Sequence, residues 1–307
     1  MQRRFNLLSA ALSLCILVGL GRDSQVETPD RRPMPERVAA VRFEQLAPKR
    51  STAGPFRIAG LWKIDGGDPR FGGLSALAVR PGGLLALTDS GVLIDLPRPG
   101  SGRVIRLRDL PAGPGYATYK KYRDSESLIL DAGGMWIGFE NLHSLWRFEG
   151  SRASAMALPG RGWKRNSGIE AMVRDPVDGA LLLLPENRRE VLRVVDGRVV
   201  ARVPLEGATG GLADAAMLPD GRVVVAVREI GLGLTNRLSW LERTASGYSL
   251  RPFAALPLGP FDNVEGLAAE VLPSGGTRLW AVTDNDGWRR TLLLALDLPP
   301  KRQGPKT

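Results

Sequence analysis

The sequence of 307 residues predicts an all-β fold, namely a β-propeller built from four-stranded blades. Short runs of Val, Leu, Ile and Trp alternate with turns rich in Gly, Pro and Asp, and no stretch keeps a helical period. That texture is typical of consecutive hairpins. Similar segments also recur at intervals in the forties to fifties, which is the range of propeller repeats. The equivalent points are Ser75, Glu126, Glu170, Asp214 and Glu265, which lie 51, 44, 44 and 51 residues apart.

Each repeat reads as a strand, a turn and a second strand that ends in polar residues. The repeats begin with LSALAV at Leu74, SESLIL at Ser125, GIEAMV at Gly168, LADAAML at Leu212 and VEGLAA at Val264. Two more strand-like runs follow in the first four repeats, whereas the fifth has only RTLLLALDL. The run FRIAGLWKID at Phe56–Asp65 is expected to supply the missing strand and close the ring. Five blades are counted, and a sixth in the irregular segments is left open.

The N-terminus has the pattern of an export signal. Arg3 and Arg4 precede an apolar run from Leu7 to Leu20, which is short for a membrane span but typical of a secretory signal. We therefore expect residues 1–21 to be a signal peptide and the protein to be periplasmic or secreted, without a stable membrane span after cleavage. An uncleaved N-terminal anchor is the alternative. Cys15 is the only cysteine, so the exported chain has no disulfide or thiolate metal site.

The rest of the chain divides by composition. Residues 22–54 are rich in Pro and charge, which predicts mostly a flexible linker with one short ordered piece. The propeller is expected to cover residues 55–299, and residues 300–307 a basic tail. The formal net charge of +10 favours an anionic small-molecule partner. Because the basic residues are scattered, nucleic acid is not expected as a partner. A monomer is the default state.

Polar residues recur where one mouth of the propeller channel should lie. The first strand of each blade lines the channel and the second runs antiparallel to it, so the start of the first and the end of the second meet at the same mouth. Carboxylates and amides crowded there need protonation, a paired arginine or a bound cation. The residues collected at this mouth are Ser75, Asp89, Asp124, Glu126, Glu140, Asn166, Glu170, Glu186, Asn187, Asp214, Arg228, Asn263, Glu265, Asp284, Asn285 and Asp286.

Oxygen ligands without Cys or His clusters favour Ca²⁺, and we predict a calcium site at this mouth. The predicted ligands are Glu126, Glu140, Glu170, Asp214, Asn263, Glu265 and Asp284. Glu170 and Glu126 are the catalytic candidates. The predicted substrate contacts are Arg228, Asp89, Asn166 and Arg165. A structural interpretation stays open, because Asp and Asn at strand ends often cap turns. Arg228 either holds an anionic substrate or neutralises the carboxylates around it.

Other catalytic patterns are missing from the sequence. There is no G-x-S-x-G elbow, P-loop or H-E-x-x-H motif. His143 is the sole histidine and follows Glu140 by three residues. We interpret it as a solvated turn residue, with a role in proton transfer as the alternative.

Several motifs together resemble a known family. They are FGGLSAL, LTDSG, DSESL, GFE, NSGIEA, GGLADAAMLPDGR and DNVEGLA followed by TDND, spread over Phe56 to Leu298. This set resembles the bacterial "esterase-like activity of phytase" family, also called phytase-like domain proteins. The resemblance implies an exported propeller with phosphoester or ester hydrolase activity. More distantly, the sequence is similar to calcium-dependent β-propeller phytases and lactonase propellers.

We therefore expect an exported, metal-dependent hydrolase of phosphoesters or related esters that acts at the acidic mouth. Two alternatives stay open. One is a lactonase or carboxylester hydrolase, in which a mouth carboxylate or His143 moves protons. The other is a non-enzymatic periplasmic propeller that binds a ligand or partner, since the fold alone does not decide function.

Overall fold

The computed structural model describes residues 28–158, 168–187, 189–285, 287 and 289–300. The chain divides into two compact units, Met1–Asp30 and Arg31–Thr307, and all described strands lie in the second. The predicted signal peptide and residues 301–307 of the predicted tail lie outside the described residues. No helix in the described part of the chain has the length and hydrophobicity that a membrane crossing requires.

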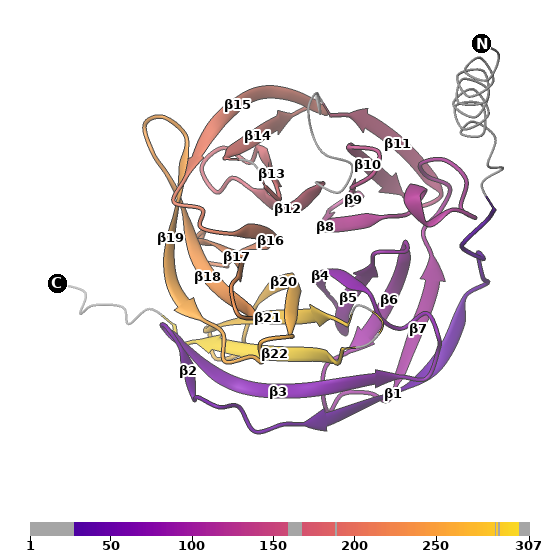
Figure 1. Ribbon diagram of the computed structural model, residues 1–307, viewed down its shortest axis with the longest axis horizontal. Helices are drawn as coiled ribbons and strands as arrows, with labels where there is room; N and C mark the ends of the chain where they lie inside the picture. The colour runs from indigo at the N-terminus through magenta and orange to yellow at the C-terminus, as the bar shows by residue number, and fades with distance from the viewer. Residues whose placement is uncertain (1–27, 159–167, 188, 286, 288, 301–307) are drawn as a thin grey trace, which may run out of the picture. The chain divides into compact units, whose positions relative to one another are not determined.

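The strands of the second unit form antiparallel four-stranded groups arranged around a centre, so the predicted β-propeller is confirmed (Figure 1). The first group is β4 (Leu74–Arg80), β5 (Gly83–Thr88), β6 (Val92–Pro97) and β7 (Val104–Asp109). The second is β8 (Ser125–Asp131), β9 (Gly134–Phe139), β10 (Ser144–Glu149) and β11 (Arg152–Ala157). The third is β12 (Ile169–Arg174), β13 (Leu181–Pro185), β14 (Glu190–Val195) and β15 (Arg198–Glu206). The fourth is β16 (Gly211–Met217), β17 (Val223–Ile230), β18 (Leu234–Arg243) and β19 (Tyr248–Ala255). The innermost strands β4, β8, β12, β16 and β20 contact one another around the ring.

The last group mixes both ends of the propeller chain. It contains β20 (Asn263–Val271), β21 (Thr277–Asp284), β22 (Thr291–Leu298) and β3 (Phe56–Gly66). β3 pairs antiparallel with β22, from Arg57 opposite Asp297 to Ile64 opposite Thr291. The prediction that an N-terminal strand closes the ring is therefore confirmed.

The segment expected to be mostly linker contains a full strand, which corrects that expectation. In β1 (Arg37–Gln45), the first four residues pair with β7 and the last five pair with β3. The two-residue strand β2 (Thr52–Ala53) also pairs with β3. Charged side chains at three of the nine β1 positions do not prevent pairing, because eight of its residues are partly or fully exposed and an outer strand leaves such side chains in water.

The apolar runs of the sequence lie where neighbouring blades cover both faces of a strand. Every residue of β5 and of β13 is buried, which accounts for the runs GLLALT and LLLLP, since strands covered on both faces lose the polar alternation. The outer strand β15 keeps that alternation, with exposed residues between partly buried ones. This packing holds the inner strands in fixed positions around the channel.

Candidate functional site

A β-bulge recurs near the start of every inner strand. In each of the five groups, the register with the second strand shifts by one residue at this point. A bulge places an extra residue outside the normal alternation and re-aims its side chain, which is why bulges are frequent beside active sites. The extra residues are Ser75, Glu126, Glu170, Ala213 and Glu265.

The fourth repeat departs from the equivalence that the sequence suggested. Its bulge residue is Ala213, so Asp214 lies one position beyond Glu170 in the repeat. Asp214 is 2% exposed, and its carboxylate accepts hydrogen bonds from the backbone N–H groups of Leu267 (2.6 Å) and Ala215 (2.7 Å). Burial raises the pKa of Asp214. Its carboxylate therefore ties β16 to β20, and Asp214 does not line the cavity described next.

The inner strands enclose a polar cavity of about 520 Å³ at the mouth of the channel. Eight of the predicted site residues line it, whereas Asn166 and Arg165 lie outside the described residues. Lys120 and Asn141 also line it; neither was selected from the sequence, although Asn141 directly follows Glu140 and Lys120 precedes Asp124 by four residues. The lining residues that carry polar side chains are Ser75, Asp89, Lys120, Asp124, Glu126, Glu140, Asn141, Glu170, Glu186, Arg228, Asn263, Glu265 and Asp284.

Three carboxylates on one side of the cavity form a group suited to a metal ion. Asp124, Glu126 and Glu140 each offer one oxygen, and these oxygens lie within 4.8 Å of one another. Asp124 precedes β8, Glu126 is the bulge residue of β8, and Glu140 follows β9 with its backbone N–H bonded to the Asp124 carbonyl at 2.9 Å. An all-oxygen, anionic donor set fits a hard divalent cation such as Ca²⁺.

Without a cation, these carboxyl groups hold their protons more tightly than usual. Burial and the neighbouring Asp124 carboxylate raise the pKa of Glu140 to about 7. Burial also raises the pKa of Glu126 well above its usual value, with a further contribution from Glu170. The pKa of Glu170 is also raised well above its usual value, first by burial and then by the neighbouring Glu265 carboxylate. Crowded, desolvated carboxylates produce such shifts.

These shifts predict how stability depends on pH when a chelator is present. An unfolded glutamate ionises near 4.5, whereas Glu140 keeps its proton to about 7. Between these values the folded protein holds a proton that the unfolded chain has released, so the free energy of unfolding falls as pH rises. Allowing for solvent screening of this partly exposed group, we expect Glu140 to contribute about 1–2 kcal/mol, or a fall in Tm of roughly 2–6 °C between pH 5 and pH 8.

Differential scanning calorimetry of the chelator-treated protein checks this prediction. Glu140→Gln should flatten the fall in Tm, while Glu242→Gln at an exposed site should leave it unchanged. A Tm that is constant from pH 5 to pH 8, or the same slope in Glu140→Gln as in the parent, would contradict it.

Arg228 also lines the cavity and is surrounded by acids. Its guanidinium donates a short hydrogen bond to Glu265, a 2.9 Å bond to Glu186 and a 3.4 Å bond to Asn263, and it lies 4.0 Å from Glu170. Burial alone would lower the pKa of Arg228, but these carboxylates raise it above its usual value. Asn263 also donates to Glu265 at 2.6 Å. The contacts favour the interpretation that Arg228 neutralises the carboxylates around it.

A second cation lies beside the three-carboxylate group. Lys120, in the short 3-10 helix η1 (Lys120–Tyr122), places its Nζ 2.7 Å from Asp89 and 3.9 Å from Asp124. Its side chain is 48% exposed, in contrast to 17% for Arg228. Asn141 donates a short hydrogen bond to Asp124. Lys120 is therefore the more exposed of the two described cations that line the cavity.

His143 lies in the turn between β9 and β10 with a φ of 44°, and it is absent from the residues that line the cavity. Its side chain is partly buried, and burial lowers its pKa. The predicted turn position is therefore confirmed. The partial burial differs from the fully solvated position that we expected.

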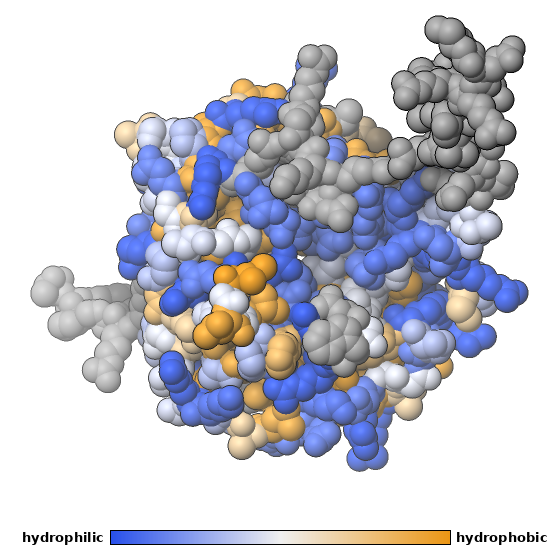
Figure 2. All heavy atoms as spheres, in the orientation of Figure 1, coloured by the Kyte–Doolittle hydropathy of each residue, from blue (hydrophilic) through white to orange (hydrophobic). Residues whose placement is uncertain are grey.

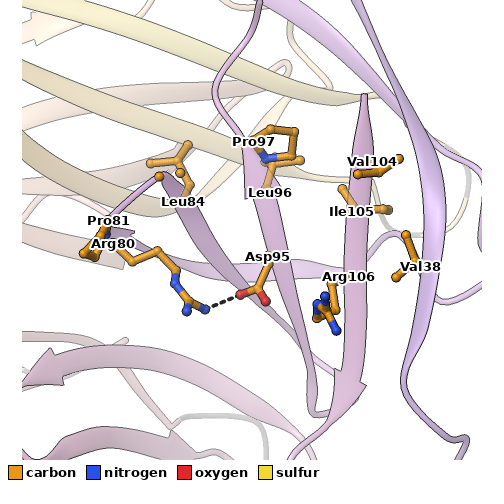
Figure 3. Close-up of a pocket in the computed structure, with 12 residues that line it drawn as sticks. Val38, Arg80, Pro81, Leu84, Asp95, Leu96, Pro97, Val104, Ile105 and Arg106 are labelled. Carbon is orange, nitrogen blue, oxygen red and sulfur yellow. Dashed lines mark hydrogen bonds and ion pairs between the residues drawn. The ribbon is translucent and has the colours of Figure 1, made fainter. Parts of the chain in front are cut away.

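Another cavity lies at the far end of the first blade. Figure 3 shows Arg80, the last residue of β4, pointing toward Asp95, with Leu84, Pro97 and Val104 also lining this cavity. This cavity of about 320 Å³ is lined mostly by apolar side chains, and Asp95 is held by Arg80 and Arg108. Its single carboxylate is already paired, so the acidic central cavity is the candidate site.

The fold and this site together define a β-propeller with a carboxylate-lined central cavity. A family model described as Phytase-like, esterase-like activity of phytase, matches residues 69–287, and the chain belongs to this family. The predicted resemblance is thus confirmed. No curated protein matches the chain.

Several solved structures resemble the chain, at low sequence identity. Glutaminyl cyclase from Myxococcus xanthus is 15% identical, with 87% of this chain and 99% of that chain covered and a TM-score of 0.46. The PQQ-bound aldose sugar dehydrogenase from Streptomyces coelicolor is 12% identical, with 86% and 100% covered and a TM-score of 0.46. A catalytically inactive virginiamycin B lyase from Staphylococcus aureus is 11% identical, with 83% and 99% covered and a TM-score of 0.45.

Proposed function

We propose that the protein is an exported, calcium-dependent hydrolase of phosphoesters or related esters, and that the reaction takes place in the central cavity. Membership of a family described by esterase-like activity supports a hydrolase. The observation that carries the proposal is the group of Asp124, Glu126 and Glu140 beside the buried carboxyl of Glu170 in one cavity. The N-terminal apolar run supports export.

In this proposal, Asp124, Glu126 and Glu140 hold Ca²⁺. When bound, the ion supplies positive charge against the anionic oxygens of the ester. The Asn141 amide, bonded to Asp124, and the backbone bond between Glu140 and Asp124 keep these ligands in place. Because the ligands come from the start of β8 and the end of β9, neighbouring strands of one blade fix their spacing.

Glu170 is the group proposed to move a proton. It is 5% exposed and lines the cavity, and burial raises the pKa of its carboxyl. A carboxyl whose pKa is raised toward the working pH is suited to exchange a proton with water or a leaving group. Arg228 holds Glu265 and Glu186 beside it, which prevents further ionised carboxylates from repelling the substrate. Lys120 is proposed to contact the anionic group of the substrate.

The test is release of phosphate from phytate and from a small aryl phosphate, measured in calcium and in chelator. We expect release in calcium and its loss in chelator. Carboxylester and lactone substrates assayed in parallel distinguish the related ester activities. No turnover of any of these substrates by folded protein with calcium bound would contradict a hydrolase and would leave a binding propeller.

A further inference from the structure

Each blade places one residue at the same point beside the central cavity, where its second strand ends. This residue follows the pairing partner of the residue that precedes the bulge. The five residues at this point all line the cavity, and they are Asp89, Glu140, Glu186, Arg228 and Asp284. Four blades therefore carry an acid here, whereas the fourth carries an arginine. Because the bulge residue of the fourth blade is Ala213, this blade adds no carboxylate at either position.

The guanidinium of Arg228 joins carboxylates of the two neighbouring blades. One terminal nitrogen donates to Glu265 of the last blade, and the other donates to Glu186 of the third blade at 2.9 Å. Glu170, at the bulge of the third blade, is 5% exposed, and Arg228 at 4.0 Å is its only ion-pair partner among the described residues. Arg228 therefore collects carboxylate oxygens from separate strands, as a bound metal ion does.

The cavity thus contains two carboxylate groups that differ in what lies between them. In the three-carboxylate group of the second blade, the oxygens lie within 4.8 Å of one another, and the described residues form no other such set. Hydrophilic residues gather over β8, which carries this group, on the face shown in Figure 2. In the group of Glu170, Glu186 and Glu265, called here the Arg228 group, the carboxylates surround the guanidinium. Since crowded carboxylates need a cation or a proton, the Arg228 group has its cation built in.

We propose that Arg228 permanently fills a second cation position in the cavity and so limits the protein to one divalent ion. A guanidinium and a divalent cation use the same carboxylate oxygens, and their like charges repel at short range. The oxygens that a second ion would need are therefore already taken, and the single ion goes to the three-carboxylate group. This inference rests on the calcium binding proposed above, but it concerns the number of ions and not the reaction.

Removing the guanidinium should open the second position. The full chain is treated with chelator and then titrated with calcium in a calorimeter. Arg228→Ala is expected to raise the uptake from about one ion per chain to about two. Arg228→Lys is the matched control, because it keeps a positive charge at the same point, and its uptake should equal that of the parent. Circular dichroism in calcium checks that each variant is folded. If Arg228→Ala does not fold, Arg228→Gln, which keeps hydrogen-bond donors beside the carboxylates, takes its place with the same expected gain.

A second substitution locates each ion. Added to Arg228→Ala, Glu186→Gln should remove the additional ion, because Glu186 belongs to the Arg228 group. In the same background, Glu126→Gln should instead remove the ion of the three-carboxylate group and keep the additional one.

The inference is overturned if the parent takes up two ions, if the folded Arg228→Ala variant takes up no more than the parent, or if Arg228→Lys gains an ion as well. Failure of the proposed function gives different results. A parent that binds one ion but hydrolyses no substrate contradicts the hydrolase alone. A parent that binds none contradicts calcium dependence, whereas an ion gained in Arg228→Ala and lost again with Glu186→Gln still supports the role of Arg228.

Discussion

Replacing Arg228 with methionine is expected to cost about 3–5 kcal/mol of folding free energy at pH 8, because the change leaves buried carboxylates without their counter-charge. The guanidinium contacts Glu265, Glu186 and Asn263 directly, and Glu265 is 8% exposed. Methionine fills a similar volume, so the loss reports on charge rather than on a cavity. Chemical denaturation at several pH values measures it.

The pH dependence separates this explanation from a general packing defect. Without Arg228, the neighbouring carboxyl groups lose the cation that favours their ionised form, so the penalty is present at high pH and shrinks as they protonate toward pH 5. Arg251→Met serves as the control, because Arg251 pairs with Glu242 in an exposed position, and such a change usually costs less than about 1 kcal/mol. An Arg228→Met penalty that is equal at pH 5 and pH 8 would refute the counter-charge explanation.

Glu126→Gln and Glu170→Gln are expected to abolish most hydrolysis for different reasons. Glu126→Gln removes a charged ligand of the three-carboxylate group, so calcium binding weakens and activity at low calcium is lost. Glu170→Gln keeps that group but removes the carboxyl proposed to move a proton, so kcat should fall by about 10²–10⁴-fold. Calorimetric titration of calcium, together with rates across a calcium series, distinguishes the two variants.

The expected pattern has a defined control. Excess calcium should restore part of the activity of Glu126→Gln and none of that of Glu170→Gln, whereas Glu242→Gln should resemble the parent in both assays. Full activity in Glu170→Gln would remove this residue from the mechanism. Unchanged calcium affinity in Glu126→Gln would place the ion elsewhere.

The propeller was predictable because hairpins, turns and a repeat all occur in the sequence. The N-terminal strand Phe56–Gly66 was predictable from the strand missing in the last repeat. β1 (Arg37–Gln45) was not, because it lies in a segment rich in charge and Pro, and its pairing partners β3 and β7 become neighbours only after the ring has formed. Pairing that depends on tertiary structure leaves little local signal.

The ring of acidic residues was predictable from topology, but the direction of each side chain was not. Glu126, Glu170 and Glu265 reach the cavity from bulges, and a bulge changes which residue faces inward. The sequence aligned Asp214 with them, although Ala213 holds the bulge and Asp214 bonds to the backbone of β20. A shift of one residue in a strand moves a side chain to the other face.

The pairing of β3 with β22 has a consequence for how the chain folds. The last blade joins residues that are 240 positions apart in the sequence, as in the ion pair between Arg57 and Asp297. On the ribosome, β3 emerges early and can pair with β1 and β2, but the pairing that closes the ring waits until β22 has been made. Contacts of such long range slow folding and leave an unpaired strand edge exposed meanwhile. Ring closure is therefore a late event in the maturation of this protein, and a chain truncated before β22 is expected to be prone to aggregation.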